Sequence, residues 1–211
     1  MVPTKLRLFR SEFGDRQFKL LDIGAGNHSA SLVKHYLPNC LYHGVDISKD
    51  YNNDESDFAL MEDFWEMDLT KLNFDAIPDN TFDAILMAHI IEHLENGDEV
   101  LKGLSRKLKK GGVIYLEYPG ERSLHLPSKK GTLNFHDDDT HVRVYSVPEL
   151  SNVLIEQRFE IKKSGTRKDW RYIALMPLKI PYHLLKSGYV PGSVYWDWYG
   201  FAEFIFAKKL K

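Results

Sequence analysis

The segment FKLLDIGAG, residues 18–26, decides the fold. Its first six residues, Phe18–Ile23, form a short apolar run stopped by glycine, which predicts a buried strand. Two glycines one residue apart, Gly24 and Gly26, permit a sharp turn and let the backbone approach a ligand without interference from a Cβ atom. Residues 29–37 then carry apolar side chains at helical spacing. The segment therefore predicts a unit of strand, glycine turn and helix.

Short apolar runs continue to alternate with helical patterns along the chain, as in a parallel α/β sheet. Six further strands are predicted, over residues 41–47, 64–69, 82–88, 113–118, 159–164 and 201–208. One helix is predicted over residues 98–109, where apolar residues share a face before a basic last turn. Another begins at Ser146, whose spacing from Glu149 fits a capping box. Residues 48–57 are polar and are predicted as a loop.

Composition and charge limit the class of protein. A chain of 211 residues, 43% apolar and 27% charged, fits one globular domain over residues 1–211. A polar insertion is expected over residues 119–145 and an aromatic-rich segment over residues 166–200. The net charge of −2, without a block of like charges, argues against non-specific binding to nucleic acid. One cysteine, no signal-peptide pattern and no long apolar run predict a cytoplasmic protein without a membrane span.

Acidic residues stand at the ends of three successive predicted strands. Asp22 precedes the glycine turn, and it either contacts a ligand or only caps that turn. Asp46 follows at the end of the second strand, where a carboxylate can accept hydrogen bonds from both hydroxyls of a ribose. Asp68 and Leu69, after the third strand, place a polar group beside an apolar one, which suits an adenine ring. Each acid alone is typical of loops, but the three in this order predict a nucleotide site.

An NAD(P)-dependent oxidoreductase is the main competing function. The third glycine of the dinucleotide pattern GxGxxG would stand at position 29, which is Ser29. That glycine allows close helix packing around a pyrophosphate, so its absence disfavours a dinucleotide. A module that binds a cofactor without turnover is a further alternative, because a nucleotide site does not by itself demonstrate chemistry.

Five motifs in this order resemble the class I S-adenosylmethionine-dependent methyltransferases, and among them bacterial small-molecule methyltransferases. The motifs are LLDIGAGNHS (20–29), HGVDIS (43–48), EMDLT (66–70), FDAILMAHIIEHL (82–94) and KKGGVIYLEYP (109–119). The resemblance implies a Rossmann-like α/β fold with a seven-stranded, mostly parallel sheet of order 3-2-1-4-5-7-6. The last strand would be antiparallel, and helices would cover both faces.

The same resemblance implies that S-adenosylmethionine is the cofactor and that ten residues bind it. The glycine turn would approach its amino-acid part, the acid of the second strand its ribose, and the end of the fourth strand its sulfonium side. The expected residues are Asp22, Gly24, Ala25, Gly26, Asp46, Ile47, Asp68, Leu69, Ala88 and His89.

Transfer to an oxygen acceptor needs a base, and histidine has a suitable pKa. The candidate catalytic residues are His93, His136 and His141. On a helix, His89, Glu92 and His93 would share a face, which resembles the ExxEH arrangement of methyltransferases that use a divalent ion. Related helix starts carry Glu-His without metal, so no metal is expected here. The cluster of acids and histidines at 136–143 is a metal site, a catalytic dyad that faces the acceptor, or a solvated loop tip.

The acceptor is expected to be a small molecule that receives the methyl group on oxygen or nitrogen. Eight Trp and Tyr residues in the segment 166–200 could stack on a sugar or aromatic acceptor, or could form core or a self-association surface. A sugar or a lipid-linked glycan precursor is the expectation from this segment and the insertion.

Overall fold

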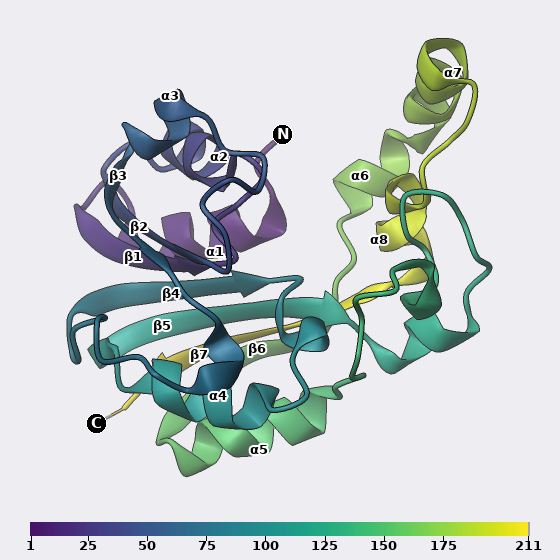
Figure 1. Cartoon of the computed structure of the whole chain (residues 1–211). Coiled ribbons are helices and arrows are strands. Elements are labelled where there is room, and N and C mark those ends of the chain that lie inside the picture. Colours follow the sequence, from purple (N-terminus) through teal and green to yellow (C-terminus); the bar gives the residue numbers. More distant parts are fainter. Residues whose placement is uncertain (211) are drawn as a thin grey trace.

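The computed structural model describes residues 1–210, which form a seven-stranded sheet between two layers of helices (Figure 1). The strand order is β3-β2-β1-β4-β5-β7-β6, and this confirms the expected topology. The strands are β1 (Phe18–Ile23), β2 (Cys40–Asp46), β3 (Met61–Glu66), β4 (Phe82–Ala88), β5 (Leu108–Pro119), β6 (Phe159–Thr166) and β7 (Ala202–Lys209).

The first five strands pair in parallel, and β7 lies antiparallel between β5 and β6. β1 and β4 have the predicted bounds, because both are mostly apolar runs with a parallel neighbour on each side. The register pairs Ile23 with Val45 and with Met87, so β1, β2 and β4 end together at one edge of the sheet. Ligands of such sheets bind at that edge.

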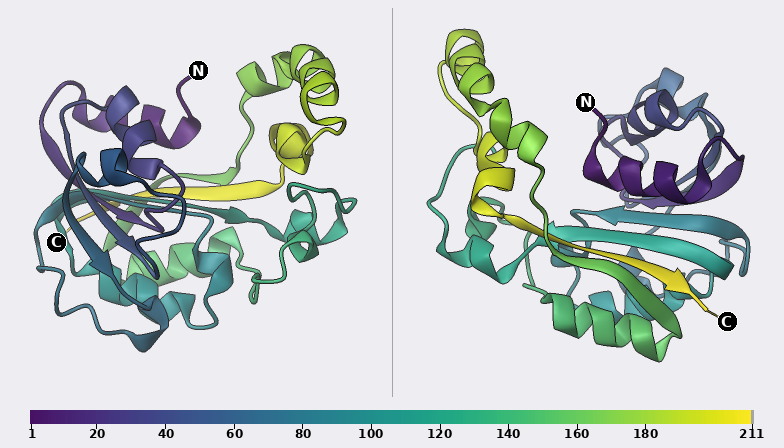
Figure 2. Two further views of the ribbon diagram at one scale, coloured as in Figure 1. Left: turned by 45° about the horizontal axis from the view of Figure 1, so that its top comes forward. Right: turned by 180° about the vertical axis from the view of Figure 1, so that it is seen from behind.

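Helices cover both faces of the sheet (Figure 2). On one face lie α1 (Thr4–Phe13), α2 (Ser29–Tyr36) and the short α3 (Glu55–Phe58). α4 (Gly97–Ser105) and α5 (Val147–Glu156) lie on the other. Each face has its own apolar core: Leu6 and Phe9 of α1 are buried in one, and Leu104 and Leu154 in the other.

Several predicted bounds are wrong because long-range pairing overrides local pattern. The helix predicted over 98–109 ends at Ser105, and β5 already begins at Leu108, which pairs with Phe82 of β4. The third strand lies at Met61–Glu66 rather than 64–69, because these residues pair with β2. The predicted loop 48–57 contains the start of α3, and α1 has no counterpart in the sequence prediction. The capping box of Ser146 and Glu149 is confirmed at the start of α5.

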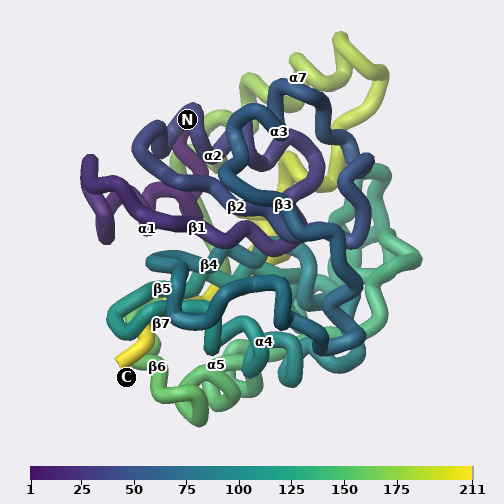
Figure 3. The backbone as a smooth tube through the Cα atoms, turned by 60° about the vertical axis from the view of Figure 1, so that its left-hand side comes forward, coloured from purple at the N-terminus to yellow at the C-terminus, as the bar shows by residue number. Residues whose placement is uncertain are grey.

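The last part of the chain projects beyond the carboxyl ends of the strands. The segment 166–200 contains α6 (Trp170–Ala174), α7 (Met176–Ser187) and α8 (Trp196–Tyr199), and α7 extends away from the sheet (Figures 1 and 2). The backbone trace shows α7 and the loops of residues 119–145 on the same side of the molecule (Figure 3). Within residues 1–210, no helix is both long and apolar enough to cross a membrane.

Candidate active site

The turn between β1 and α2 is held against β2 by its backbone. The N–H groups of Gly24 and Ala25 both donate to the carbonyl of Val45, at 2.8 and 3.0 Å. Gly24 has a φ of +80°, and a Cβ atom there would overlap the Ile90 side chain. A Cβ atom on Gly26 would lie 2.5 Å from the ring of Tyr51. Both glycines are therefore required by this turn, as the sequence predicted.

Asp46 ends β2 with its carboxylate beside this turn. Its Oδ2 accepts a hydrogen bond from the Gly26 N–H at 2.9 Å, and its Oδ1 accepts one from the Ile47 N–H at 2.7 Å. A third backbone N–H, that of Ser48, donates to Oδ1 at 3.5 Å. A carboxylate has about four acceptor positions, so these bonds orient Asp46 and leave capacity for a further donor. Binding of the ribose hydroxyls by Asp46 stays a prediction. The Ile47 side chain is 70% exposed and free to pack on a ring.

Asp22 lies beneath the same turn and is 2% exposed. Its Oδ2 accepts hydrogen bonds from the hydroxyls of Ser29 and Tyr42, at 2.6 and 2.7 Å. Burial raises the pKa of Asp22, against the opposing effects of Lys5 and of these two hydroxyls. Because Ser29 is the first residue of α2, this contact ties Asp22 to the start of the helix. Asp22 accepts there from a side-chain hydroxyl and not from a backbone N–H, and the N-cap residue of α2, His28, makes no side-chain cap. Contact of Asp22 with a ligand stays a prediction.

The two residues after the glycine turn adopt left-handed backbone conformations, with φ values of 55° at Asn27 and 58° at His28. The Nδ1 atom of His28 lies 2.6 Å from Oδ2 of Asp57, and the hydroxyl of Ser31 donates to Oδ1 at 2.5 Å. Asp57 is fully buried in α3. This buried acid holds the loop in place, and the polar composition of residues 48–57 gave no sign of it.

The expected adenine-side residues follow β3. Asp68 accepts hydrogen bonds at Oδ1 from the N–H and the hydroxyl of Thr70, at 3.0 and 2.6 Å, and so caps the 3-10 turn Leu69–Lys71. These hydrogen bonds lower the pKa of Asp68. Its side chain is 36% exposed, so the carboxylate keeps access to solvent and to a ligand. Ala88, at the end of β4, is half-buried.

His89 follows β4 in a left-handed conformation, with a φ of 58°. Its Nε2 lies 3.2 Å from Oε1 of Glu117, and its Nδ1 lies 3.3 Å from Oε1 of Glu92. Burial alone would lower the pKa of His89, but hydrogen bonds and charges from Glu117 and Glu92 raise it to about 9. At neutral pH His89 is therefore a cation held by two carboxylates, and it is unsuited to act as a base.

Glu117, near the end of β5, is the centre of a buried charged network. The Arg167 Nε lies 3.4 Å from Oε1 of Glu117, and Arg167 Nη2 lies 3.5 Å from Oδ2 of Asp197. The Tyr115 hydroxyl donates to the other Glu117 oxygen. Burial opposes ionisation, but Arg167 and His89 hold the pKa of Glu117 well below its usual range. No signal in the sequence indicated that Glu117, Arg167 and Asp197 form one network, because they lie far apart in the chain.

Two of the three candidate catalytic histidines lie together. His93 belongs to the 3-10 turn Ile91–His93 after β4, and its ring centroid is 4.9 Å from that of His141. His141 comes from the insertion, which reaches this turn through the N–H groups of Val142 and Arg143, both donating to the Glu92 carbonyl. His136 is exposed and packs edge-on against Phe135. The catalytic roles of all three stay predictions.

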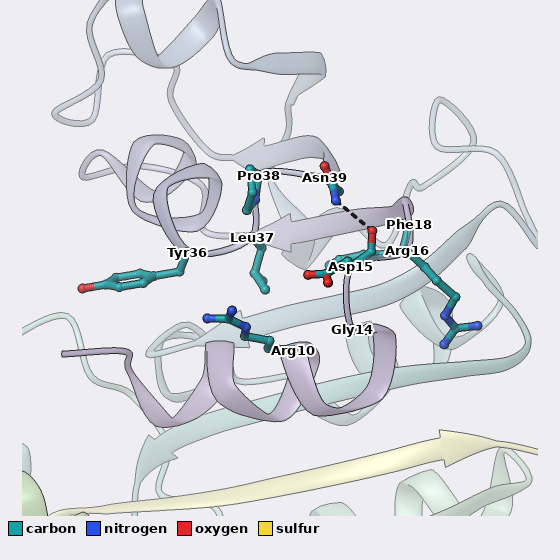
Figure 4. A pocket seen from close by; sticks show the side chains of 9 residues that line it. All are labelled: Arg10, Gly14, Asp15, Arg16, Phe18, Tyr36, Leu37, Pro38 and Asn39. Carbon is teal, nitrogen blue, oxygen red and sulfur yellow. Dashed lines mark hydrogen bonds between the residues drawn. The ribbon is translucent and has the colours of Figure 1, made fainter.

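A small hollow elsewhere is lined by residues of α1, β1 and the loop after α2 (Figure 4). Asn39 donates to the Asp15 carbonyl at 2.7 Å on its rim. Phe18, the first residue of β1, lines it, so it lies at the amino end of the strand. Ligands of open α/β sheets bind at the opposite end, so this hollow is not the functional site.

Comparisons with known proteins identify the family of the chain. A family model described as "Methyltransferase domain" matches residues 2–163. A comparison with curated proteins found no match. Among solved structures, a SAM-dependent methyltransferase from Archaeoglobus fulgidus is similar at 20% identity, with a TM-score of 0.60 and coverage of 97% of this chain and 91% of that one.

Two further structures are similar over almost the whole chain. An S-adenosylmethionine-dependent methyltransferase from Mesorhizobium loti has 14% identity and a TM-score of 0.66, covering 97% of this chain and 96% of its own. The 1,6-didemethyltoxoflavin-N1-methyltransferase of Burkholderia thailandensis has 14% identity and a TM-score of 0.60, with coverage of 98% and 76%. These likenesses concern the fold. Together with the family match, they show that the chain belongs to the methyltransferase domain family and is a class I S-adenosylmethionine-dependent methyltransferase.

Proposed function

We propose that the chain transfers the methyl group of S-adenosylmethionine to an oxygen or nitrogen atom of a small-molecule acceptor bound near His89. The observation that carries this proposal is a cover that two segments of the chain form at the carboxyl ends of β4 and β5. Residues 119–145 and 166–200 pack together in one apolar cluster, which contains Leu126 and Leu133 of the first segment, Tyr195, Trp196 and Tyr199 of the second, and the adjoining Phe201. Gly192 N–H donates to the Lys130 carbonyl at 2.9 Å.

An aromatic side chain of this cover reaches the end of β4. The Trp196 ring lies 4.9 Å from the His89 ring and is stacked on Phe201 at 4.8 Å. Its indole N–H donates to the Thr132 carbonyl of the insertion at 2.5 Å. A fixed aromatic surface beside His89 would orient an acceptor and exclude water, and both effects favour an in-line displacement.

The cofactor roles follow from the turn and the strand ends. S-adenosylmethionine supplies a methyl group on a positively charged sulfur. In the proposal, the backbone of Gly24, Ala25 and Gly26 approaches its amino-acid part, with the buried Asp22 behind. Asp46 binds the ribose. The remaining predicted residues contact the adenine or border the sulfonium side: Ile47, Asp68, Leu69, Ala88 and His89.

The net charge of the side chains around His89 favours binding of the positively charged sulfonium of the cofactor nearby. The network contains two cations, His89 and Arg167, and three carboxylates, Glu92, Glu117 and Asp197. Its net charge is negative when all five groups are ionised. A fixed negative charge in a partly buried site stabilises a neighbouring sulfonium before the reaction. For an oxygen acceptor, His93 or His141 would take the proton, with His136 as the more exposed third candidate.

We propose a sugar or a lipid-linked glycan precursor as the acceptor. The enzyme would reach this acceptor at an anionic lipid surface to which α7 binds. α7 supports this, because it exposes Leu178, Tyr182 and Leu185, the last at 90%. The same helix carries Lys179 and Lys186 and no acidic residue. Exposed apolar and basic side chains on one helix are typical of binding to anionic lipids. The similar Burkholderia enzyme, crystallised with 1,6-didemethyltoxoflavin and S-adenosylhomocysteine, supports a small acceptor.

The test is transfer of labelled methyl from S-adenosylmethionine to a metabolite library that includes sugars and lipid-linked sugars in phosphatidylglycerol vesicles. We expect label on one small-molecule class, with stoichiometric S-adenosylhomocysteine. The matched pair is Leu185→Ser, which should lower transfer to vesicle-borne acceptors, and Leu72→Ser, an exposed apolar residue outside α7, which should not. Cofactor binding without transfer to any acceptor would instead support a non-catalytic module. Label on protein or nucleic acid alone would contradict the acceptor class.

A further inference from the structure

Beside His89, three side chains from two segments converge on one point. Glu92 and His93 come from the 3-10 turn after β4, and His141 comes from the insertion. One ligand atom from each of the three lies within 4.8 Å of the others. The insertion is tied to this turn, since Val142 and Arg143 donate to the Glu92 carbonyl at 2.9 and 3.2 Å. Their meeting is therefore a feature of the fold and not of mobile side chains.

Glu92 is the decisive member of this cluster. It is 1% exposed; its Oε1 faces His89 Nδ1 at 3.3 Å, and its Oε2 has no hydrogen-bond partner within residues 1–210. His141 Nε2 lies 4.0 Å from Oε1. A buried carboxylate is costly unless its oxygens are paired or coordinate a metal. Oε2 of Glu92 therefore remains available for coordination.

The two imidazoles are oriented as metal ligands usually are. Nδ1 of His141 lies 2.6 Å from the Phe135 carbonyl, and Nδ1 of His93 lies 3.0 Å from the Thr140 carbonyl. A carbonyl oxygen can only accept, so Nδ1 of His141 donates and its Nε2 is left for a ligand. Nδ1 of His93 lies 3.0 Å from the Thr140 hydroxyl as well, and donation to the Thr140 carbonyl leaves its Nε2 for a ligand in the same way. Histidines that bind metals commonly donate their other N–H to a carbonyl or carboxylate in this way.

We propose that Glu92, His93 and His141 bind a divalent transition-metal ion. Two imidazoles and one carboxylate suit Zn²⁺ or Mn²⁺, and three protein ligands leave a coordination position open. His89 is not a ligand, because it is already paired with Glu117 and Glu92. The triad thus differs from the helix face His89, Glu92 and His93 suggested by sequence spacing, and from the expectation that no metal binds.

A second acidic cluster serves as a contrast. His28, Asp54 and Asp57 also lie close enough to hold an ion. Asp57 is fully paired there: its oxygens contact His28 at 2.6 Å and accept from Ser31 at 2.5 Å. These contacts leave the buried acid satisfied without a metal. The proposal therefore predicts one binding site per chain and not two.

The test is calorimetric titration of untagged, chelator-treated full-length protein with Zn²⁺ and with Mn²⁺. We expect one site per chain. His141→Ala and Glu92→Gln should each weaken binding by about tenfold or more, with folding checked by circular dichroism. The matched control is His136→Ala, an exposed histidine of the same insertion, which should bind as the wild type does.

Co²⁺ provides a second readout that needs no enzyme activity. Its visible absorption reports nitrogen and oxygen ligation, and we expect that spectrum to change in His141→Ala and to persist in His136→Ala and His28→Ala. Absence of saturable binding to the folded wild type would overturn the proposal. Equal loss of affinity in His136→Ala, or loss confined to His28→Ala, would overturn it as well. Because metal binding is measured directly, its failure leaves the methyl-transfer proposal standing.

Discussion

At the scale of single residues, charged side chains surround the end of β4. His89, Glu117 and Arg167 come from three segments, and each is largely buried. Because His89 is held as a cation, it can shape the field at the reaction centre but cannot accept the acceptor's proton. This separation leaves His93 and His141, which can accept that proton only when they do not bind the metal proposed above, because a coordinated imidazole has no free lone pair.

Arg167→Ala tests this network. The substitution leaves Glu117 and Asp197 buried with one fewer cation, so we expect a loss of about 3 kcal/mol in the free energy of unfolding. Lys162→Ala removes an exposed ion pair with Glu160 and should cost less than about 1 kcal/mol. Denaturant unfolding of both variants measures the difference. Equal losses would show that the Arg167 pairs contribute no more than a surface pair.

At the scale of elements, the turn between β1 and α2 depends on glycine. Gly24→Ala forces a side chain into a positive φ and against Ile90. Gly188→Ala imposes the same backbone strain at the end of α7, where a Cβ atom meets nothing within 4 Å. We expect Gly188→Ala to cost about 1–2 kcal/mol and Gly24→Ala about 1 kcal/mol more, measured by denaturant unfolding. Equal losses in the free energy of unfolding for the two variants would mean that the Ile90 side chain moves aside without cost.

Asp137, in the insertion, is expected to make the stability of the protein depend on pH. Asp137 accepts hydrogen bonds from the N–H groups of Lys129, Leu133 and Asn134 and from the Ser128 hydroxyl. Burial alone would raise the pKa of Asp137, but these bonds lower it to about 2. Its pKa in the unfolded chain is about 4, so its stabilising effect is complete above about pH 4 and disappears as the pH falls towards 2.

Thermal unfolding of Asp137→Asn checks the direction of this pH dependence. The variant should melt below the wild type at neutral pH, and the gap should close as the pH falls from about 4 to about 2. Asp139→Asn is the control, because Asp139 is exposed and its substitution should leave the melting temperature unchanged throughout. A gap that widens on acidification would contradict the assignment.

Local signals in the sequence were enough for some elements and not for others. The apolar runs of β1 and β4 and the Ser146 capping box are local, and their predictions are confirmed. The end of α4 was wrong because Leu108 looks helical by spacing but pairs with Phe82. At the candidate site, spacing predicted the glycine turn and Asp46, whereas Glu117 and Arg167, 50 residues apart, meet only through the β5–β7–β6 pairing.

At the scale of the whole molecule, we expect the strands β1 to β3 and the strands β4 and β5 to serve different functions. Gly24, Asp46 and Asp68 follow or end β1, β2 and β3, and these are residues that we propose to bind the cofactor. Beyond the ends of β4 and β5 lie the insertion and the segment with α6, α7 and α8 (Figure 1). The reaction centre is therefore expected where these two groups of strands meet, at His89.

The central claim is that this edge of the sheet binds S-adenosylmethionine through Asp46. Calorimetric titration with S-adenosylmethionine and S-adenosylhomocysteine tests it most directly. We expect one site per chain, a loss of affinity of about tenfold or more in Asp46→Ala, and wild-type affinity in Asp50→Ala, an exposed acid in the neighbouring loop. Failure of the folded wild type to bind either nucleoside, or unchanged affinity in Asp46→Ala, would contradict the account.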